Sequence, residues 1–268
     1  METKQVVAIK ILNLDIGDEE VQDVQQEITL LSNLSKSETQ NIITYHGAFL
    51  SGTKIWIIMD YCSGGSVRTL LKAGRIEERY AAVIMREMLV ALQFIHNQGI
   101  IHRDIKAANV LVFRDGRVQL CDFGVAAQLT AAQVKRTSMI GTPFWMAPEV
   151  INRSGYNQKA DIWSLGITLY EIITGAPPFA DQDIKRAVKL IPSTKPTRLE
   201  GSQYSAPLKE FVALCLDEQP DSRPTAEELL KGRFVKATKS VSYSILKDLI
   251  IRYQQWREKN KNARDSFL

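Results

Sequence analysis

Two polar side chains, Asn109 and Asp122, stand where a single cation could bind both. They lie equally far from the centre of Asp115-Gly116, a dipeptide typical of hairpin turns. We therefore expect them to face each other across the open end of a hairpin. An amide oxygen and a carboxylate held together suit a hard cation such as Mg²⁺. Asp104 lies near enough to Asn109 in the sequence to share the same pocket.

A second candidate pair joins Lys10 and Glu27. Lys10 belongs to an apolar, β-branched run over 6–12, whose alternation places it on one face with Ala8 among apolar neighbours. A buried ammonium group needs an anion. Glu27 lies on the inward stripe of an amphipathic helix predicted over 18–34. Taken alone, this glutamate could equally point to solvent, but each residue supplies the partner that the other needs.

The elements that must position these residues follow from periodicity. Strands are predicted over 6–12, 110–113 and 117–121, with two more between 41 and 61 around a turn at Ser51-Gly52 and a linker over 62–66. Helices are predicted over 18–34, 77–97, 158–174, 182–190, 206–217 and 225–231. The helix over 158–174 is apolar almost all round, so we expect it at the centre of the fold, ending at Gly175.

Composition excludes several classes of protein. The chain has 268 residues, of which 45% are hydrophobic and 24% charged, as in ordinary globular proteins. The formal charge of +4 is too small to argue for nucleic acid as a partner, and no apolar run is long enough to span a bilayer. The widely spaced Cys62, Cys121 and Cys215 indicate neither a disulfide framework nor a metal cluster. They fit a reducing, cytoplasmic location.

The last part of the chain, over 240–268, combines an amphipathic stretch with a basic end. Such a helix could touch a membrane surface. The alternative, which we favour, is a helix packed on the preceding domain and followed by a solvated tail.

Short motifs then occur in a fixed order along the chain, and together they are far more specific than any one of them. They are Val7-Ala8-Ile9-Lys10, the inward Glu27, His102-Arg103-Asp104 with Asn109, Asp122-Phe123-Gly124, and Ala147-Pro148-Glu149. In these motifs the chain resembles a eukaryotic protein kinase. Lys106 and the string over 141–149 resemble the serine/threonine branch. Together with the strings over 56–62 and 249–256, that string also resembles sterile-20-like kinases of the third germinal-centre group. The segments over 56–66 and 99–127 are most similar to the fungal polarity kinases of the Nak/Kic type.

The resemblance implies a fold class and a division of the chain. We expect an α+β, two-lobed kinase fold. Residues 1–61 would form a partial small lobe, with a truncated antiparallel sheet and one helix. Residues 62–236 would form the hinge and a mainly helical large lobe, and residues 237–268 an amphipathic helix with a basic tail.

The resemblance also implies ATP and Mg²⁺ as cofactors and protein serine or threonine hydroxyls as acceptors. Lys10 would hold the α- and β-phosphates and would be fixed by Glu27. Asp104 would accept or orient the proton of the substrate hydroxyl, and Lys106 would neutralise charge on the transferring group. Asn109 and Asp122 would bind Mg²⁺.

Adenine would lie between Ala8 and Leu111 in this resemblance. Met59 would stand at the back of its pocket, and Asp60 and Cys62 would offer backbone groups to the ring.

The resemblance also implies which residues regulate activity through phosphorylation. Ser138 falls on the usual phosphorylation position, with Thr137 beside it, and Arg103 would receive the phosphate. A polar loop residue without a regulatory role is the alternative for Ser138. Thr142 is expected to bond Asp104 or Lys106 instead of accepting phosphate.

Four further residues have expected roles in the structure rather than in the chemistry. Glu149 and Arg223 are expected to form a buried pair, and Asp161 to anchor the catalytic loop. Cys121 is expected to be a small buried side chain beside the nucleotide, although a thiol-reactive ligand could reach it.

The pattern is broken at the beginning of the sequence. No G-x-G-x-x-G stands before Val7-Ala8-Ile9-Lys10, where the family carries a glycine-rich loop and two strands. The working hypothesis is an active kinase in the full-length protein, with this chain weak or inactive. The alternative is a binding scaffold without catalysis. A small-molecule kinase is disfavoured, because the segment from Asp122 to Glu149 resembles a complete platform for protein substrates.

Partners and place in the cell follow from the resemblance alone. It implies protein substrates, an armadillo-repeat scaffold gripping the small lobe, and a role in cell polarity and morphogenesis. A cytoplasmic location, including cortical growth sites, is expected.

Overall fold

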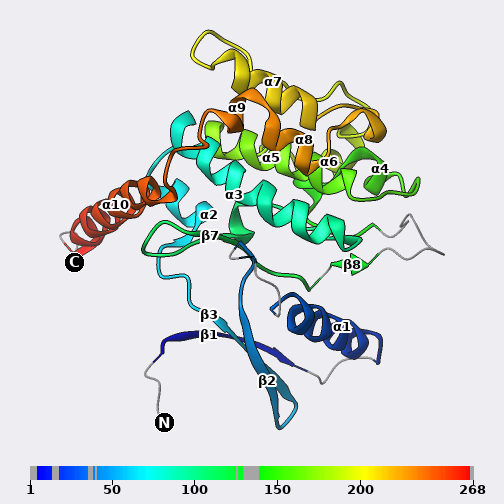
Figure 1. Ribbon diagram of the computed structural model, residues 1–268, viewed down its shortest axis with the longest axis vertical. Coiled ribbons are helices and arrows are strands. Elements are labelled where there is room, and N and C mark those ends of the chain that lie inside the picture. Colours follow the sequence, from blue (N-terminus) through cyan, green and yellow to red (C-terminus); the bar gives the residue numbers. More distant parts are fainter. Residues whose placement is uncertain are drawn as a thin grey trace.

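The computed structural model describes residues 5–13, 18–35, 39, 41–124, 126–128 and 139–265. Figure 1 shows two lobes, with a small sheet and one helix below and a mainly helical body above. The extended stretch over residues 61–64 leads from one lobe into the other, and residues 41–43 of the small lobe also reach the large lobe, where Asn41 and Ile43 pair with the backbone of Leu120. This arrangement is the expected α+β, two-lobed fold with a small antiparallel sheet.

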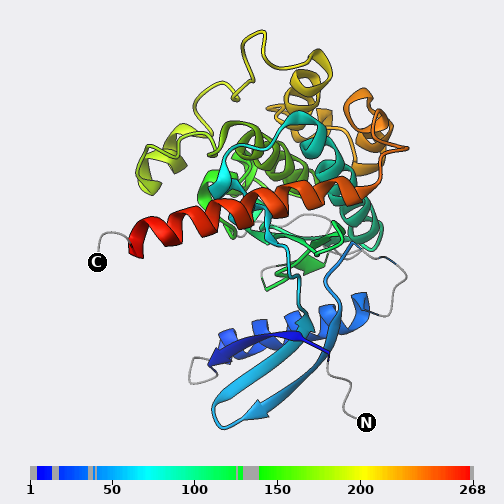
Figure 2. The same cartoon turned by 90° about the vertical axis from the view of Figure 1, so that its left-hand side faces the viewer.

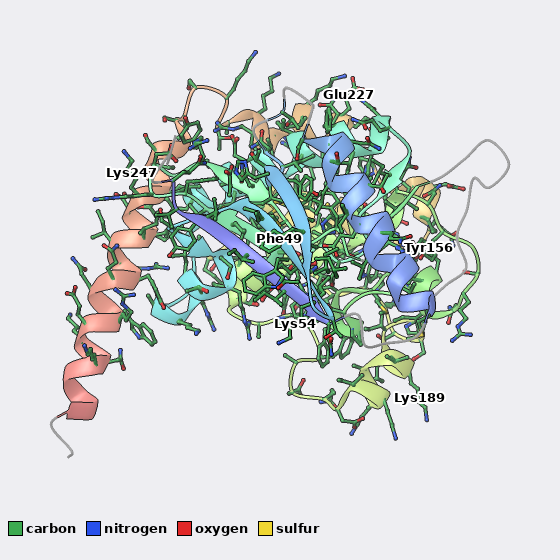
Figure 3. The ribbon with its side chains drawn as sticks, turned by 90° about the horizontal axis from the view of Figure 1, so that it is seen from below. Phe49, Lys54, Tyr156, Lys189, Glu227 and Lys247 are labelled. Atoms are coloured by element: carbon green, nitrogen blue, oxygen red, sulfur yellow. The ribbon has the colours of Figure 1, made fainter. Side chains whose placement is uncertain are left out.

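The small lobe is an antiparallel sheet of three strands covered by one helix. Its strands are β1 (Val7–Asn13), β2 (Tyr45–Ser51) and β3 (Lys54–Asp60), in the spatial order β1-β3-β2. The register pairs Lys10 with Ile57 and Ala8 with Met59. Helix α1 (Asp18–Leu34) lies on one side of the sheet, as Figures 1 and 3 show.

The alternation predicted for the first strand is present in β1. Ala8, Lys10 and Leu12 share the less exposed face, while Ile9 and Ile11 are 47% and 48% exposed on the other. Lys10 therefore points to the side on which α1 supplies its carboxylate.

The large lobe begins with short elements around a hairpin. They are β4 (Gly65–Ser66), α2 (Val67–Leu70), η1 (Leu71–Ala73), α3 (Glu78–Asn97), β5 (Ile100–Ile101), η2 (Ala107–Asn109), β6 (Val110–Val112), β7 (Val118–Leu120) and β8 (Ala127–Gln128). Helices make up the rest: η3 (Pro143–Trp145), α4 (Pro148–Ile151), α5 (Lys159–Thr174), α6 (Ile184–Leu190), α7 (Ala206–Cys215), η4 (Pro220–Ser222), α8 (Ala226–Lys231), α9 (Arg233–Lys236), η5 (Tyr243–Leu246) and α10 (Lys247–Asp265). The helices predicted from periodicity are present, with ends shifted by a few residues.

Helix α5 forms the centre of the large lobe. Most of its side chains are buried, which explains why its sequence is apolar almost all round. It ends at Gly175, whose φ of 98° is left-handed, as expected for a glycine that stops a helix. Gly166 brings α5 close to α7, since a Cβ there would lie 2.6 Å from Cβ of Cys215.

The hairpin register differs from the prediction by one residue. Val110 pairs with Leu120, so the partner of Asn109 is Cys121, whose N–H donates to the Asn109 carbonyl at 3.0 Å, and not Asp122. The reason is the length of the turn. Phe113 pairs with Arg117, so the turn contains three residues, whereas the predicted turn contained only Asp115 and Gly116. Asp122 thus lies one residue beyond the paired end of the hairpin.

The C-terminal segment packs against the large lobe, as favoured from the sequence. Figure 2 shows α10 running across one side of this lobe. Leu246, at the end of η5, and Leu249, in the first turn of α10, are both buried. Among the described residues, no helix is long and apolar enough to cross a membrane.

Candidate active site

Lys10 joins the sheet, the small-lobe helix and the segment after the hairpin. Its ammonium group donates to Glu27 Oε1 at 2.8 Å and to Asp122 Oδ1 at 3.0 Å. Burial lowers the pKa of Lys10, but the hydrogen bonds and charges of Glu27 and Asp122 more than offset this and raise it above its ordinary value. Lys10 is therefore a fixed cation at neutral pH. Glu27 is 4% exposed at its side chain and Asp122 is 45% exposed, so only Asp122 is open to a ligand.

A second cluster surrounds Asp104. One of its carboxylate oxygens accepts from the Thr142 hydroxyl at 2.5 Å, and the other lies 2.7 Å from the Lys106 ammonium group. Lys106 also donates to Thr142 at 2.6 Å, so Thr142 contacts both of its expected partners. Burial raises the pKa of Asp104, but hydrogen bonds from Lys106 and Thr142, the charge of Lys106 and a hydrogen bond from Asn109 bring it below its ordinary value. Asp104 is consequently ionised at neutral pH.

Asn109 connects the two clusters. Its amide nitrogen donates to both the carbonyl and the carboxylate of Asp104, at 2.8 and 2.9 Å. Its amide oxygen has no partner among the described residues. The backbone pairing of Asn109 with Cys121 then places Asp122 next in line. The two expected Mg²⁺ ligands therefore belong to one connected network, although the structure gives no direct contact between them.

The backbone is strained at both ends of this network. Arg103 and Asp122 have backbone φ values of 69° and 65°, in the left-handed region that residues other than glycine rarely adopt. Asp161, fully buried in α5, holds the backbone at Arg103, because its carboxylate accepts hydrogen bonds from the N–H groups of His102 and Arg103 at 2.9 Å each. This is the anchoring role expected for Asp161. His96 donates to the same carboxylate at 2.9 Å.

The residues expected around adenine occupy two sides of the hinge. Ala8 and Met59 lie opposite each other in the sheet, and Leu111 pairs with Ser66 below the linker. The Asp60 N–H is engaged with the Thr44 carbonyl at 3.0 Å, so only its carbonyl could serve a ligand.

Cys62 supplies the other expected backbone group. Its N–H has no backbone acceptor in the described part of the chain. Burial raises the pKa of the Cys62 thiol to about 12, so this side chain is a neutral part of the core. Burial likewise raises the pKa of Cys121, which is only partly exposed.

One residue with a part in the site escaped sequence reasoning. Glu171 of α5 is 1% exposed, and its carboxylate accepts from the Ala107 N–H at 3.3 Å and the Trp145 ring N–H at 3.0 Å. Arg68 donates to its other oxygen at 3.1 Å. Burial raises the pKa of Glu171 despite these donors. A second carboxylate, besides Asp161, within a mostly apolar helix was the sequence signal that could have revealed it.

The expected buried pair of Glu149 and Arg223 is present. Arg223 is 0% exposed and donates two hydrogen bonds to Glu149, at 2.6 and 2.9 Å. Its guanidinium group also lies over the Trp163 ring. The pair ties the end of the segment from Asp122 to Glu149 to the rest of the large lobe. Ser138 and Thr137, the expected phosphorylation positions, lie outside the described residues.

The donor set fits MgATP by its chemistry. The Asp122 carboxylate, which is 45% exposed, and the amide oxygen of the buried Asn109 are the ligand types of a hard cation. The adjacent ammonium group of Lys10 suits phosphate oxygens. No cluster of three or more His, Cys, Asp or Glu side chains that could hold a metal was found in the parts of the chain described.

A two-lobed fold with a lysine–glutamate pair in its small lobe, beside an aspartate–lysine–asparagine loop, defines a protein kinase. The protein kinase domain family matches residues 1–235, so the chain belongs to this family.

The curated relatives are fungal serine/threonine-protein kinases, consistent with the expected sterile-20-like type. KIC1 of Saccharomyces cerevisiae is 55% identical over 98% of this chain. The Schizosaccharomyces pombe kinases ppk11 and sid1 are 44% and 45% identical over 96% and 88% of it. The chain spans 24% of KIC1, 81% of ppk11 and 50% of sid1.

Proposed function

We propose that this chain is the catalytic domain of a serine/threonine protein kinase, which transfers the γ-phosphoryl group of MgATP to protein hydroxyls. The observation that carries the proposal is the connected network from Glu27 through Lys10 and Asp122 to Asn109 and Asp104. It sets a phosphate-binding cation and a hydroxyl-binding carboxylate in one site. The names of the relatives support serine and threonine as acceptors.

Each side chain has a separate part in this reaction. Lys10, held by Glu27, donates to phosphate oxygens, and Asn109 and Asp122 supply oxygen ligands for the metal. MgATP, when bound, supplies the phosphoryl group and a leaving group whose charge the metal neutralises. Asp104 accepts the hydrogen bond of the incoming hydroxyl and orients its oxygen. Lys106 places a positive charge beside that carboxylate, where negative charge develops on the transferring group.

The remaining roles extend from the same site. Ala8, Leu111 and Met59 would border adenine, with Asp60 and Cys62 bonding its edge. Phosphorylation at Ser138 or Thr137 would place an anion near Arg103, whose guanidinium group already donates to the Ala126 carbonyl at 3.2 Å.

The proposal for the whole protein goes further. We infer a part in cell polarity and morphogenesis, from the similarity to fungal kinases of the Kic type. An armadillo-repeat partner on the small lobe, a cytoplasmic location that includes cortical growth sites, and the division at residues 61 and 236 remain part of this proposal.

The test combines binding and transfer. MgATP binding by calorimetry is measured on the 268-residue chain, followed by phosphate transfer to a generic basic protein and to a panel of small metabolites. Asp122→Ala should abolish both binding and transfer, whereas Asp181→Ala, an exposed aspartate of the large lobe, should leave both unchanged.

Other outcomes would favour another function or contradict the proposal. Binding without transfer would favour the scaffold, and labelling of metabolites alone would favour a small-molecule kinase. A folded chain that binds no MgATP would contradict the proposal for this chain.

A further inference from the structure

The C-terminal segment lies outside the residues that the family matches, yet it packs against the hinge. The match ends at residue 235, whereas η5 and α10 span 243–265. Figure 2 shows α10 crossing the side of the large lobe near the stretch that joins the two lobes. This segment therefore has a structural relation to the site that the family match does not describe.

Specific contacts fix α10 in place. The Tyr80 hydroxyl of α3 donates to Asp248 at 2.9 Å. Arg252 donates to the backbone carbonyls of Gly74 and Arg75, at 3.0 Å each. These bonds lie on both sides of Leu249, which is 1% exposed. The helix is consequently held on α3 and on the loop after η1.

Between these anchors, Ile250 meets the hinge at Gly64. A Cβ at Gly64 would lie 2.8 Å from Cδ1 of Ile250 and 2.6 Å from the Val112 carbonyl oxygen. The Gly64 N–H donates to that same carbonyl at 2.9 Å. A Cβ at this position would therefore meet the backbone of strand β6 and the Ile250 side chain at once, so only glycine fits, and the Ile250 side chain lies directly against the hinge.

This contact reaches the backbone group expected to bond adenine. The Gly65 N–H donates to the Cys62 carbonyl at 3.0 Å, which closes a tight turn over residues 62–65. Gly65 has a left-handed φ of 82°. Since Gly64 lies inside this turn, its position sets the position of Cys62. Strand β6 carries Leu111, which pairs with Ser66 directly after the turn.

We propose that Ile250 is a positioning residue for nucleotide binding, acting through Gly64 to hold the adenine-binding hinge against strand β6. The inference rests on the proposed binding of MgATP at this hinge. Ile250 lies in α10, whereas Lys10 and Asp104, the proposed phosphate-binding and hydroxyl-binding residues, belong to β1 and to the loop after β5. Its loss should weaken binding of the adenine end and leave the transfer step itself nearly unchanged.

The experiment compares two neighbouring isoleucines in the whole chain. Ile250 is 6% exposed and Ile251 is 51% exposed, so Ile250→Ala and Ile251→Ala remove the same atoms from the same helix. Binding of MgATP and of adenosine is measured by calorimetry, well below each variant's melting temperature. The KM for ATP and kcat are measured with a generic protein substrate. Adenosine is included because it lacks phosphates and reports the hinge alone.

For Ile250→Ala we expect at least fivefold weaker binding of both ligands, a matching rise in the KM for ATP, and kcat within twofold. Ile251→Ala should match the unsubstituted chain. If Ile250→Ala does not fold, Ile250→Val removes only Cδ1 and should give the same pattern with a smaller change.

A folded variant at position 250 that binds adenosine as the unsubstituted chain does would overturn the inference, and so would a fall in kcat without a change in KM. Failure of the unsubstituted chain to bind MgATP would instead overturn the proposed function, together with the inference built on it.

Discussion

At Lys10, two carboxylates share one ammonium group, and their different exposure separates their tasks. Glu27 is closed to solvent and acts on the lysine alone, whereas Asp122 remains open to a ligand. Glu27→Gln keeps the shape but removes the charge. Because hydrogen bonds to charged groups contribute about 1.5–3 kcal/mol, kcat/KM for ATP should fall about 10- to 100-fold.

Steady-state kinetics at varied ATP concentration check this expectation. The control is Glu210→Gln, which removes a surface ion pair with Arg233 of 2.7 Å, distant in sequence from the site. Equal kcat/KM values for Glu27→Gln and the unsubstituted chain would show that the pair has no part in nucleotide binding.

The buried Asp161 carboxylate also leads to a prediction about how the stability of the fold depends on pH. Burial raises the pKa of its carboxyl group, but the His96 hydrogen bond, the charges of His96 and His102, and the His102 N–H bring it below the ordinary 3.8. The stability that this carboxylate contributes is therefore fully present above about pH 4 and is lost as pH falls through the lowered pKa. Asp161→Asn should lower stability by about 2–3 kcal/mol at pH 7 and by less at pH 3.

Urea unfolding between pH 3 and pH 7 measures this difference. The comparison with the variant is needed because the pKa values of Asp104 and Asp115 are also lowered, so other carboxylates contribute to acid unfolding. A stability difference that is constant across this pH range would argue that Asp161 does not titrate below its ordinary value in the fold.

Among the elements, helix α5 lies so close to α7 at Gly166 that a methyl group added there would have two opposing effects on stability. Alanine at position 166 would gain about 1 kcal/mol of helix propensity over glycine. Its Cβ would, however, lie 2.6 Å from Cβ of Cys215 and 3.0 Å from Leu216. Overpacking costs about 1–3 kcal/mol, so Gly166→Ala should be neutral to destabilising by about 2 kcal/mol.

Thermal unfolding followed by circular dichroism tests the sign of this change. A raised melting temperature for Gly166→Ala would mean that α7 moves away from α5 at little cost. The control is Ser193→Ala on the exposed loop after α6, which should shift the melting temperature little.

The helices and the hairpin also show how much of the fold could be predicted from the sequence. Periodicity predicted α3, α5 and α7 because each buries a continuous apolar stripe. The hairpin existed as predicted, but its register was wrong, since Asp115-Gly116 fits a three-residue turn as well as a two-residue turn. Gly116 takes a left-handed φ of 95° there.

The remaining misses depend on contacts between distant parts of the chain. Glu171 binds groups at Ala107 and Trp145, and Ile250 meets Gly64. No local pattern specifies which loop comes to which helix. The pairing of Lys10 and Glu27 was foreseeable because the sequence pattern turned both charges inward, where each needed a partner, although Lys10 is still 30% exposed.

At the scale of the whole molecule, the two lobes differ in how much apolar surface they bury. The buried core lies largely in the large lobe, whereas Val6, Ile9, Ile11, Phe49 and Leu50 of the small lobe are among the exposed large apolar side chains. Regions with few buried contacts open at lower free energy than the rest of a protein. Amide hydrogens of β1 and β2 should therefore exchange at lower opening free energy than those of α3 and α5.

MgATP should narrow this difference in opening free energy between the two lobes, because the residues proposed to bind it lie in both. Lys10 is in β1, and Asn109 and Asp122 are at the hairpin of the large lobe. A ligand at a hundred times its Kd stabilises the binding state by about 2.7 kcal/mol, and opening of the small lobe must release it. Hydrogen exchange followed by mass spectrometry, with and without MgATP, should show protection growing in β1 and α1 and nearly unchanged in α7. Protection that grows equally in all elements would mean that the two lobes open as one cooperative unit.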